Sequence, residues 1–244
     1  ITSIFCDNMK VLIVKNITRE GPGLLEEILK SHNISYDIVD LYKGESFPDI
    51  TGYSAVFVMG GPDSANDTTP KMQKELKIIK GVTDAGIPYL GSCLGMQTLV
   101  KANGGEIYKN DVKEVGWRDS EGNYFVVDLT EEGKSDPLFA RVSFPLNIFH
   151  LHGETVNLTD GMKLLATGKY CKNQIVKIGD NAYGIQGHFE LTPEMFDEWR
   201  TQDPDLISLN QEALQSDYAK LRTKYEATGK QILINFLRVA KLID

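Results

Sequence analysis

The stretch Tyr89-Leu90-Gly91-Ser92-Cys93-Leu94-Gly95-Met96-Gln97 predicts a strand, a sharp turn and a helix in immediate succession. The apolar run at 87–90 indicates a buried strand, and residues 96–102 have the composition of a helix. Glycines two positions either side of Cys93 match the elbow that presents a nucleophile between a strand and a helix. Because the positive end of a helix dipole favours a thiolate, Cys93 is a candidate nucleophile. The alternative is an ordinary buried cysteine in a strand-to-helix turn.

The composition predicts a soluble globular protein. The 244 residues suit one large domain or two small ones, and no apolar run approaches the length of a membrane span. Three widely spaced cysteines, an odd number, argue against a disulfide framework or a zinc cluster and for a reducing compartment. A net charge of −8 offers no broad basic surface to nucleic acid. We therefore expect a cytoplasmic protein with no nucleic-acid and no membrane partner.

Strands and helices alternate over the first hundred residues. Two apolar runs predict buried strands, at 10–15 and 54–59, and a further strand is predicted at 35–41. Two stretches carry apolar residues at helical spacing, 23–32 and 71–84. This alternation predicts a doubly wound, mostly parallel α/β sheet flanked by helices, with its functional site at the carboxyl ends of the strands. Short strands continue the same domain, at 106–108, 124–129, 147–150, 163–167, 174–178 and 182–186.

The chain becomes helical after Thr192, which is suited to cap a helix that begins with Pro193. Two further helices are predicted, at 206–225 and 230–242, and the last has an apolar face with spacings of three and four. We expect this face to pack on its own domain, and a dimer or partner surface is the alternative. The predicted organisation is thus a domain over residues 9–194 and a helical extension over 195–244. We interpret residues 1–8 as an expression remnant or an N-terminal extension.

A cysteine nucleophile needs a base within hydrogen-bond reach and a group that orients the base. Four histidines are available, His32, His150, His152 and His188. His188 follows a predicted strand, and Glu190 two residues later could fix the tautomer of its ring. On these residues alone, a loop histidine with an incidental acid nearby is the competing interpretation.

Three motifs occur in the order Gly60-Gly61-Pro62, Gly91-Ser92-Cys93-Leu94-Gly95-Met96-Gln97 and Gln186-Gly187-His188-Phe189-Glu190. In this order and spacing they resemble the class I, triad-type glutamine amidotransferases, over residues 10–194. The resemblance is closest to stand-alone proteins similar to the amidotransferase domain of GMP synthase. The segment Leu151-His152-Gly153-Glu154 is similar to the segment that precedes the catalytic histidine in that family.

The resemblance implies a flavodoxin-like fold and an enzyme that uses L-glutamine without a cofactor or metal. Cys93 would attack the side-chain amide to give a γ-glutamyl thioester and ammonia, His188 would transfer protons, and Glu190 would hold the histidine. Backbone N–H groups would bind the oxyanion, and two side chains would contact the substrate: Gly60, Gly61 and Leu94 for the oxyanion, and Gln97 and His152 for the substrate.

The sequence departs from the family pattern at three positions. The family usually has an aromatic residue before the catalytic histidine and a proline after it, where this chain has Gly187 and Phe189. Glu154 stands where aspartate is more common. A looser or differently shaped loop at 187–189 is therefore expected, and these differences affect the substrate pocket more than the nucleophilic chemistry.

Other interpretations remain open at this point. His150 and His152 alternate on a strand and Glu154 adds a third ligand, which is fewer than a structural metal site needs, so we favour a role in lining the pocket. No G-x-x-x-x-G-K-[ST] motif is present, so an amidotransferase would need a separate synthase chain. A γ-glutamyl hydrolase with the same triad and a non-catalytic binding module are the competing functions. A looser resemblance to PfpI-like proteins is less favoured, because Leu94 follows the cysteine where those proteins commonly have histidine. The sequence leaves the oligomeric state open.

Overall fold

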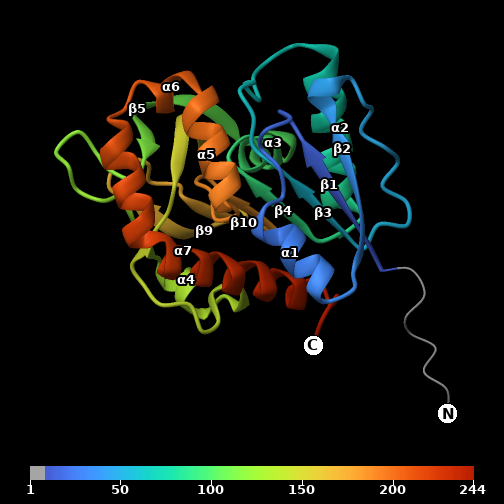
Figure 1. The fold of residues 1–244 in the computed structure, drawn as a ribbon. Helices are drawn as coiled ribbons and strands as arrows, with labels where there is room; N and C mark the ends of the chain where they lie inside the picture. The colour runs from blue at the N-terminus through green and yellow to red at the C-terminus, as the bar shows by residue number, and fades with distance from the viewer. Residues whose placement is uncertain (1–8) are drawn as a thin grey trace.

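A nine-stranded mixed sheet forms the centre of the fold in the computed structural model, which describes residues 9–244 (Figure 1). One half of the sheet is parallel, in the order β2 (Ser35–Asp40), β1 (Lys10–Lys15), β3 (Ala55–Val58), β4 (Tyr89–Ser92) and β11 (Ala182–Ile185). The other half is antiparallel, in the order β10 (Ile175–Ile178), β9 (Met162–Gly168), β6 (Val126–Leu129) and β7 (Leu146–Asn147). The predicted α/β fold is confirmed, and the interpretation of residues 1–8 lies outside the described residues.

The parallel half owes its position to continuous apolar runs. Residues Val11 to Val14 of β1 are completely buried, as are Val56 and Val58 of β3. Strands that are apolar on both faces are stable only when both faces are covered by other elements. Helices cover both faces here. Because β1, β3, β4 and β11 are parallel, their carboxyl ends lie at one edge of the sheet.

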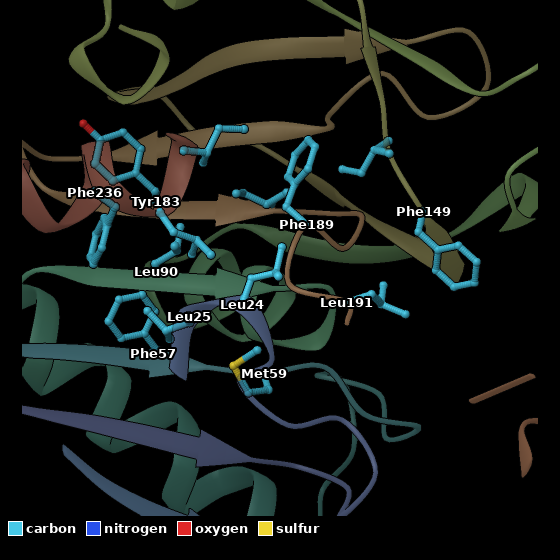
Figure 2. Close-up of a cluster of buried hydrophobic side chains, with 14 of the residues drawn as sticks. Leu24, Leu25, Phe57, Met59, Leu90, Phe149, Tyr183, Phe189, Leu191 and Phe236 are labelled. Atoms are coloured by element: carbon cyan, nitrogen blue, oxygen red, sulfur yellow. The ribbon is translucent and has the colours of Figure 1, made fainter. Parts of the chain in front are cut away.

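The helices form two layers. α1 (Leu24–Ser31), α5 (Pro193–Gln202) and α7 (Gln211–Val239) contribute to the larger core on one face, and α2 (Pro70–Asp84) and α3 (Leu94–Ala102) cover the other. Figure 2 shows Phe236 of α7 beside Phe57 and Tyr183, and the Phe57 and Phe236 rings meet edge to face at 5.0 Å. The smaller elements are η1 (Leu41–Lys43), α4 (Glu131–Ser135), η2 (Pro137–Phe139) and α6 (Pro204–Ile207).

A separate two-stranded antiparallel sheet pairs β5 (Glu106–Gly116) with β8 (His150–Asn157). The sequence predicted only short strands at 106–108 and 147–150. The prediction missed most of β5 because its buried and exposed positions do not alternate with a two-residue period, and its register shifts between Lys109 and Glu114. This sheet brings β8 to the edge where the candidate site lies.

The C-terminal helix differs from the prediction. Helices were expected at 206–225 and 230–242, but α7 is continuous over 29 residues, so a break near Gly229 is wrong. A side-chain carbon at Gly229 would lie 2.2 Å from the carbonyl oxygen of Phe189. Gly229 therefore allows the helix to lie close to the loop at 187–190, because any larger residue would collide with that loop.

The apolar face of α7 packs on its own domain. Ile232, Leu233, Phe236 and Leu237 are buried in the core that also contains α1 and the sheet. α5 begins as predicted, with Pro193 in the first turn and the Thr192 side chain accepting a hydrogen bond from Met195 N–H. No helix within residues 9–244 has the length and apolar character needed to span a membrane.

Candidate active site

Cys93 lies at the junction of β4 and α3 in a backbone conformation with φ of 51°, which non-glycine residues rarely adopt. The neighbouring glycines allow this turn. A carbon added at Gly95 would lie 2.1 Å from the Val58 carbonyl oxygen, and one added at Gly91 would lie 2.3 Å from the Gly95 backbone. The N–H of Cys93 donates to Ile185 O at 2.8 Å, which ties the turn to β11. This is the geometry that the two flanking glycines predicted.

His188 and Glu190 form a buried pair in the segment after β11. His188 Nδ1 lies 2.7 Å from Glu190 Oε1, and the two residues are 0% and 3% exposed. The second carboxylate oxygen of Glu190 accepts the Phe189 N–H at 2.9 Å. The Trp199 and His188 rings are nearly perpendicular, and their centroids lie 4.9 Å apart. Glu190 is therefore held at both oxygens, and it fixes the orientation of the imidazole.

Charge and burial shift the pKa values of His188 and Cys93. Burial alone would lower the pKa of His188, but Glu190 and Cys93 raise it well above its ordinary value. Burial also raises the pKa of the Cys93 thiol, and the helix-terminal N–H of Leu94 does not offset this. Nε2 of His188 is buried with no hydrogen-bond partner among the described residues. Of the two ring nitrogens of His188, Nε2 is thus the one without a protein partner within residues 9–244, since Nδ1 binds Glu190.

The loop at 187–190 is fixed, contrary to the expectation of a looser loop. The Tyr225 hydroxyl donates to His188 O at 2.9 Å and accepts the Leu191 N–H at 3.2 Å. The His188 N–H donates to Phe149 O at 2.8 Å. Phe189 also supplies the N–H that binds Glu190, which a proline at this position could not do. Replacement of the usual proline thus gives the carboxylate an additional donor.

Close packing also explains why the residue before His188 is a glycine, Gly187. A carbon added at Gly187 would lie 2.5 Å from Ile148 Cδ1 and 3.0 Å from Phe149 O. There is no room for the aromatic residue that the family usually has here. The packing around the residue before His188 therefore requires glycine, and a difference in loop shape from the family stays a prediction.

The loop after β3 lies beside the nucleophile. A carbon added at Gly60 would lie 3.3 Å from Cys93 Cβ, and one added at Gly61 would lie 2.6 Å from Asn16 Cβ and 3.4 Å from Leu94 Cδ2. The Asn16 side chain donates to Met59 O at 3.3 Å, which fixes the start of the loop. The three residues expected to bind the oxyanion are therefore adjacent, and their role stays a prediction.

A cavity of about 400 Å³ opens on Cys93 and is lined by Gln97 and His152, among others. Gln97 Nε2 donates to Glu154 O at 3.1 Å, and His152 Nδ1 lies 3.1 Å from the same oxygen. His152 Nε2 lies 2.8 Å from Glu114 Oε2. Both side chains are thus in the cavity wall, but the Gln97 amide nitrogen and both His152 nitrogens already have protein partners. Contact with a substrate remains a prediction for both.

Sequence comparison identifies the family. The model of the glutamine amidotransferase class-I family matches residues 22–203. This chain belongs to the class-I glutamine amidotransferase family. It is 32% identical over 192 residues to the glutamine amidotransferase-like protein YfeJ of Salmonella typhimurium, which covers 76% of this chain and 77% of that protein. One subunit of the glutamine-hydrolysing GMP synthase of Natronomonas pharaonis is 27% identical, over 66% of this chain and 82% of that relative.

Structural comparison agrees on the fold. A glutamine amidotransferase from Thermotoga maritima superposes with a TM-score of 0.83 over 97% of this chain and 100% of that one, at 24% identity. Longer proteins named as glutamine-hydrolysing GMP synthases also align, and the match spans only 24 to 34% of their length. The resemblance to class I amidotransferases, including GMP synthase-like members, is confirmed.

A buried polar group lies behind the cavity wall of this amidotransferase. Glu114, His152 and Cys171 offer ligand atoms that all lie within 4.8 Å of one another. Glu154, which the sequence suggested as a ligand, is not in this group, and His150 Nδ1 contacts His152 Nε2 at 3.2 Å. Burial lowers the pKa of His150 to about 3, so this ring is neutral at physiological pH. Glu114 binds His152 and Gln174, and Cys171 Sγ lies 3.0 Å from Thr155 Oγ1, so we interpret these residues as a network that supports β8.

Sequence reasoning missed two residues at the site. Glu20, in the loop after β1, lines the cavity with Cys93. An acid just beyond the carboxyl end of a parallel strand was an available signal. Tyr225 is 37 residues from His188 in the chain and had no local signal.

Proposed function

We propose that this amidotransferase hydrolyses the side-chain amide of L-glutamine through a cysteine thioester and supplies the ammonia to a separate synthase. The Cys93 sulfur attacks the γ-carbonyl carbon as His188 takes the thiol proton. The tetrahedral intermediate collapses, the C–N bond breaks, and His188 transfers the proton to the departing nitrogen. His188 then activates water, which releases glutamate from the thioester, while Glu190 stabilises the imidazolium.

The observation that carries the proposal is the buried His188–Glu190 pair, 2.7 Å apart, beside a cysteine in a nucleophile elbow that opens on a cavity. The shifts in pKa support it, because the raised pKa of His188 makes its ring an effective proton acceptor from Cys93. Backbone N–H groups of Leu94 and of the Gly60–Gly61 loop are proposed to bind the oxyanion, and loss of one such donor costs about 3 kcal/mol of transition-state stabilisation.

The separate synthase is proposed by analogy with a relative. The Natronomonas relative, of which this chain covers 82%, is named as one subunit of a GMP synthase. The acceptor of the ammonia is left open, and no cofactor is proposed for the glutaminase step.

The test is ammonia release from a panel of γ-glutamyl compounds, free glutamine included, by wild type and by the Cys93→Ala variant. We expect release from glutamine that Cys93→Ala abolishes. Cys171→Ala is the matched control, because Cys171 is also a buried free cysteine but does not line the cavity that opens on Cys93. Release only of substituted amines would instead indicate a γ-glutamyl hydrolase.

A second measurement separates an idle enzyme from a binding module. A glutamine analogue with an electrophilic γ-carbon should alkylate Cys93, and mass spectrometry should locate the adduct there. Alkylation without turnover would indicate activation by the partner chain. Neither alkylation nor turnover would contradict the proposal and favour a non-catalytic module.

A further inference from the structure

Glu20 places a buried carboxyl group in the candidate active site, from the loop between β1 and α1. The residue is 4% exposed, and its Oε2 atom is buried with no hydrogen-bond partner in the part of the chain that the structure describes. Glu20 also lines the cavity that opens on Cys93. Buried polar atoms are usually paired, and an unpaired one costs free energy. An N–H group from a ligand would therefore be stabilised at this oxygen.

The carboxyl group converges with the reacting side chains on one point. A carbon added at Gly60 would lie 2.1 Å from Glu20 Oε2, 3.0 Å from His188 Cε1 and 3.3 Å from Cys93 Cβ. The unpaired oxygen is therefore close to both the imidazole and the nucleophile. It lies at the reaction centre and not at the outer rim of the cavity.

The backbone that carries Glu20 is held through the preceding residue, Arg19. Arg19 donates to Asp203 Oδ2 at 2.6 Å, and Trp199 Nε1 donates to Arg19 O at 2.9 Å. Asp203 therefore engages the Arg19 guanidinium, which makes no hydrogen bond to the unpaired Glu20 oxygen. Trp199 touches His188 as well, so one side chain positions both groups.

We propose that Glu20 accepts a hydrogen bond from the nitrogen of the scissile γ-amide and of the departing ammonia, which makes the site selective for amides over esters. This inference rests on the proposed function. In that reaction the substrate carbonyl oxygen is directed to backbone N–H donors, whereas the leaving nitrogen must lie beside His188. The leaving nitrogen is thus the substrate donor nearest to the unpaired Glu20 oxygen.

Glu20 keeps its own protonation state in this step. The proton that the leaving nitrogen gains comes from the Cys93 thiol by way of His188, the S–C bond forms and the C–N bond breaks. Glu20 binds an N–H of the amide and then of ammonia, and hydrogen bonds to a charged acceptor are stronger than neutral ones. An ester substrate offers an oxygen at the same place, which has no hydrogen to donate and repels a carboxylate.

The titration of Glu20 should give the preference for amide over ester a pH dependence. Burial raises the pKa of Glu20 to about 7, His188 and Arg19 lower it, and Glu190 and Asp203 raise it. Glu20 is anionic above this pH, so the preference for amide over ester should rise as the pH rises through about 7. Titration of His188 or Cys93 acts on both substrates through the same thioester and cancels in the ratio of kcat/KM values.

The experiment compares glutamine with glutamate γ-methyl ester, which yields the same acyl-enzyme, by glutamate release from wild type and Glu20→Gln. We expect the glutamine-to-ester ratio of kcat/KM to fall about tenfold or more in Glu20→Gln, as a charged hydrogen bond is lost. The wild-type ratio should rise between about pH 6 and about pH 8 and be flat in the variant. Glu20→Met, which has no comparable acceptor, should lower the ratio further.

Glu75→Gln is the matched control, because Glu75 is also buried, has an unpaired Oε2 and has a pKa raised by burial to about 7, but its partner is Asn16. Its ratio should equal that of wild type. The inference would be overturned if Glu20→Gln left the glutamine-to-ester ratio of kcat/KM unchanged, whether or not kcat/KM falls equally for both substrates. Ester hydrolysis by a wild type that does not use glutamine would overturn it too. Failure of the proposed function looks different: wild type then releases glutamate from neither substrate, and the inference fails with it.

Discussion

Cys93 and the His188–Glu190 pair are positioned in different ways. The Cys93 turn depends on two glycines within two positions of it, because Gly91 and Gly95 leave the backbone the space that it needs against itself and against Val58. The loop with His188 and Glu190 is held by Tyr225 and Phe149, which are distant in sequence. The first geometry is encoded locally and the second by tertiary contacts.

This difference has a mechanical basis. A cysteine at φ of 51° is strained, and it persists because β4 and the first two turns of α3 are covered by neighbouring elements. A histidine loop has no regular secondary structure of its own, so its backbone groups must bind elsewhere. In this molecule the long helix α7 supplies such a partner, which makes the C-terminal region part of the site architecture.

The largest expected effect is at the elbow, in Gly95→Ala. The added carbon would lie 2.1 Å from Val58 O, a backbone atom of a buried strand that cannot move aside. We expect a loss of about 3 kcal/mol or more in the free energy of unfolding, which exceeds the gain in helix propensity of about 1 kcal/mol. Denaturant unfolding measures it.

Gly81→Ala on α2 is the control for the elbow. It is the same substitution in a helix, but the nearest atom to the added carbon is Ile50 Cδ1 at 3.8 Å. We expect this variant to be about 0.5–1 kcal/mol more stable than wild type. Equal stabilities of Gly95→Ala and wild type would show that the elbow tolerates a side chain and that its local encoding is weaker than inferred.

The next effect is at the histidine loop, in Tyr225→Phe. The variant removes the hydroxyl that binds His188 O and Leu191 N–H, so we expect about 1–2 kcal/mol less stability and about tenfold lower kcat/KM for glutamine. Cys93 should still react with a small thiol reagent, because the elbow is intact. Alkylation rates and kcat/KM measured on the same samples separate the two regions.

Tyr218→Phe is the matched control, because the Tyr218 hydroxyl on the same helix is buried without a hydrogen-bond partner among residues 9–244. Removal of an unpaired buried hydroxyl should leave stability equal or higher, with kcat/KM unchanged. If both tyrosine variants lose the same activity, then α7 acts on the site through general packing, and the hydrogen bonds of the Tyr225 hydroxyl do not position His188.

The same contrast explains which features could be predicted from the sequence. The parallel strands, the elbow and the three proposed catalytic residues depend on apolar runs and short motifs, which are visible locally. The continuity of α7 could not be predicted, because Gly229 has the signature of a helix break and its reason is contact with Phe189. Tyr225 was missed for the same reason, because its importance comes from residues that the fold brings beside it. Glu20 had a local signal, an acid just beyond a parallel strand, but its place beside Cys93 and His188 depends on the fold.

The smallest effect is expected at Gly187, the position before the proposed base. A carbon there would meet Ile148 Cδ1 at 2.5 Å, which is the far end of a side chain, although Ile148 Cγ1 at 2.6 Å and Phe149 O at 3.0 Å limit the adjustment. Gly187→Ala should therefore cost about 1 kcal/mol of stability, less than Gly95→Ala, and Ile148→Val in the same chain should restore part of it by removing that methyl group. Ile148→Val alone serves as the control, with an expected loss of about 1 kcal/mol. Additive losses in the double variant, measured by denaturant unfolding, would mean that the Phe149 backbone sets the limit, and the histidine loop would then be as intolerant of side chains as the elbow.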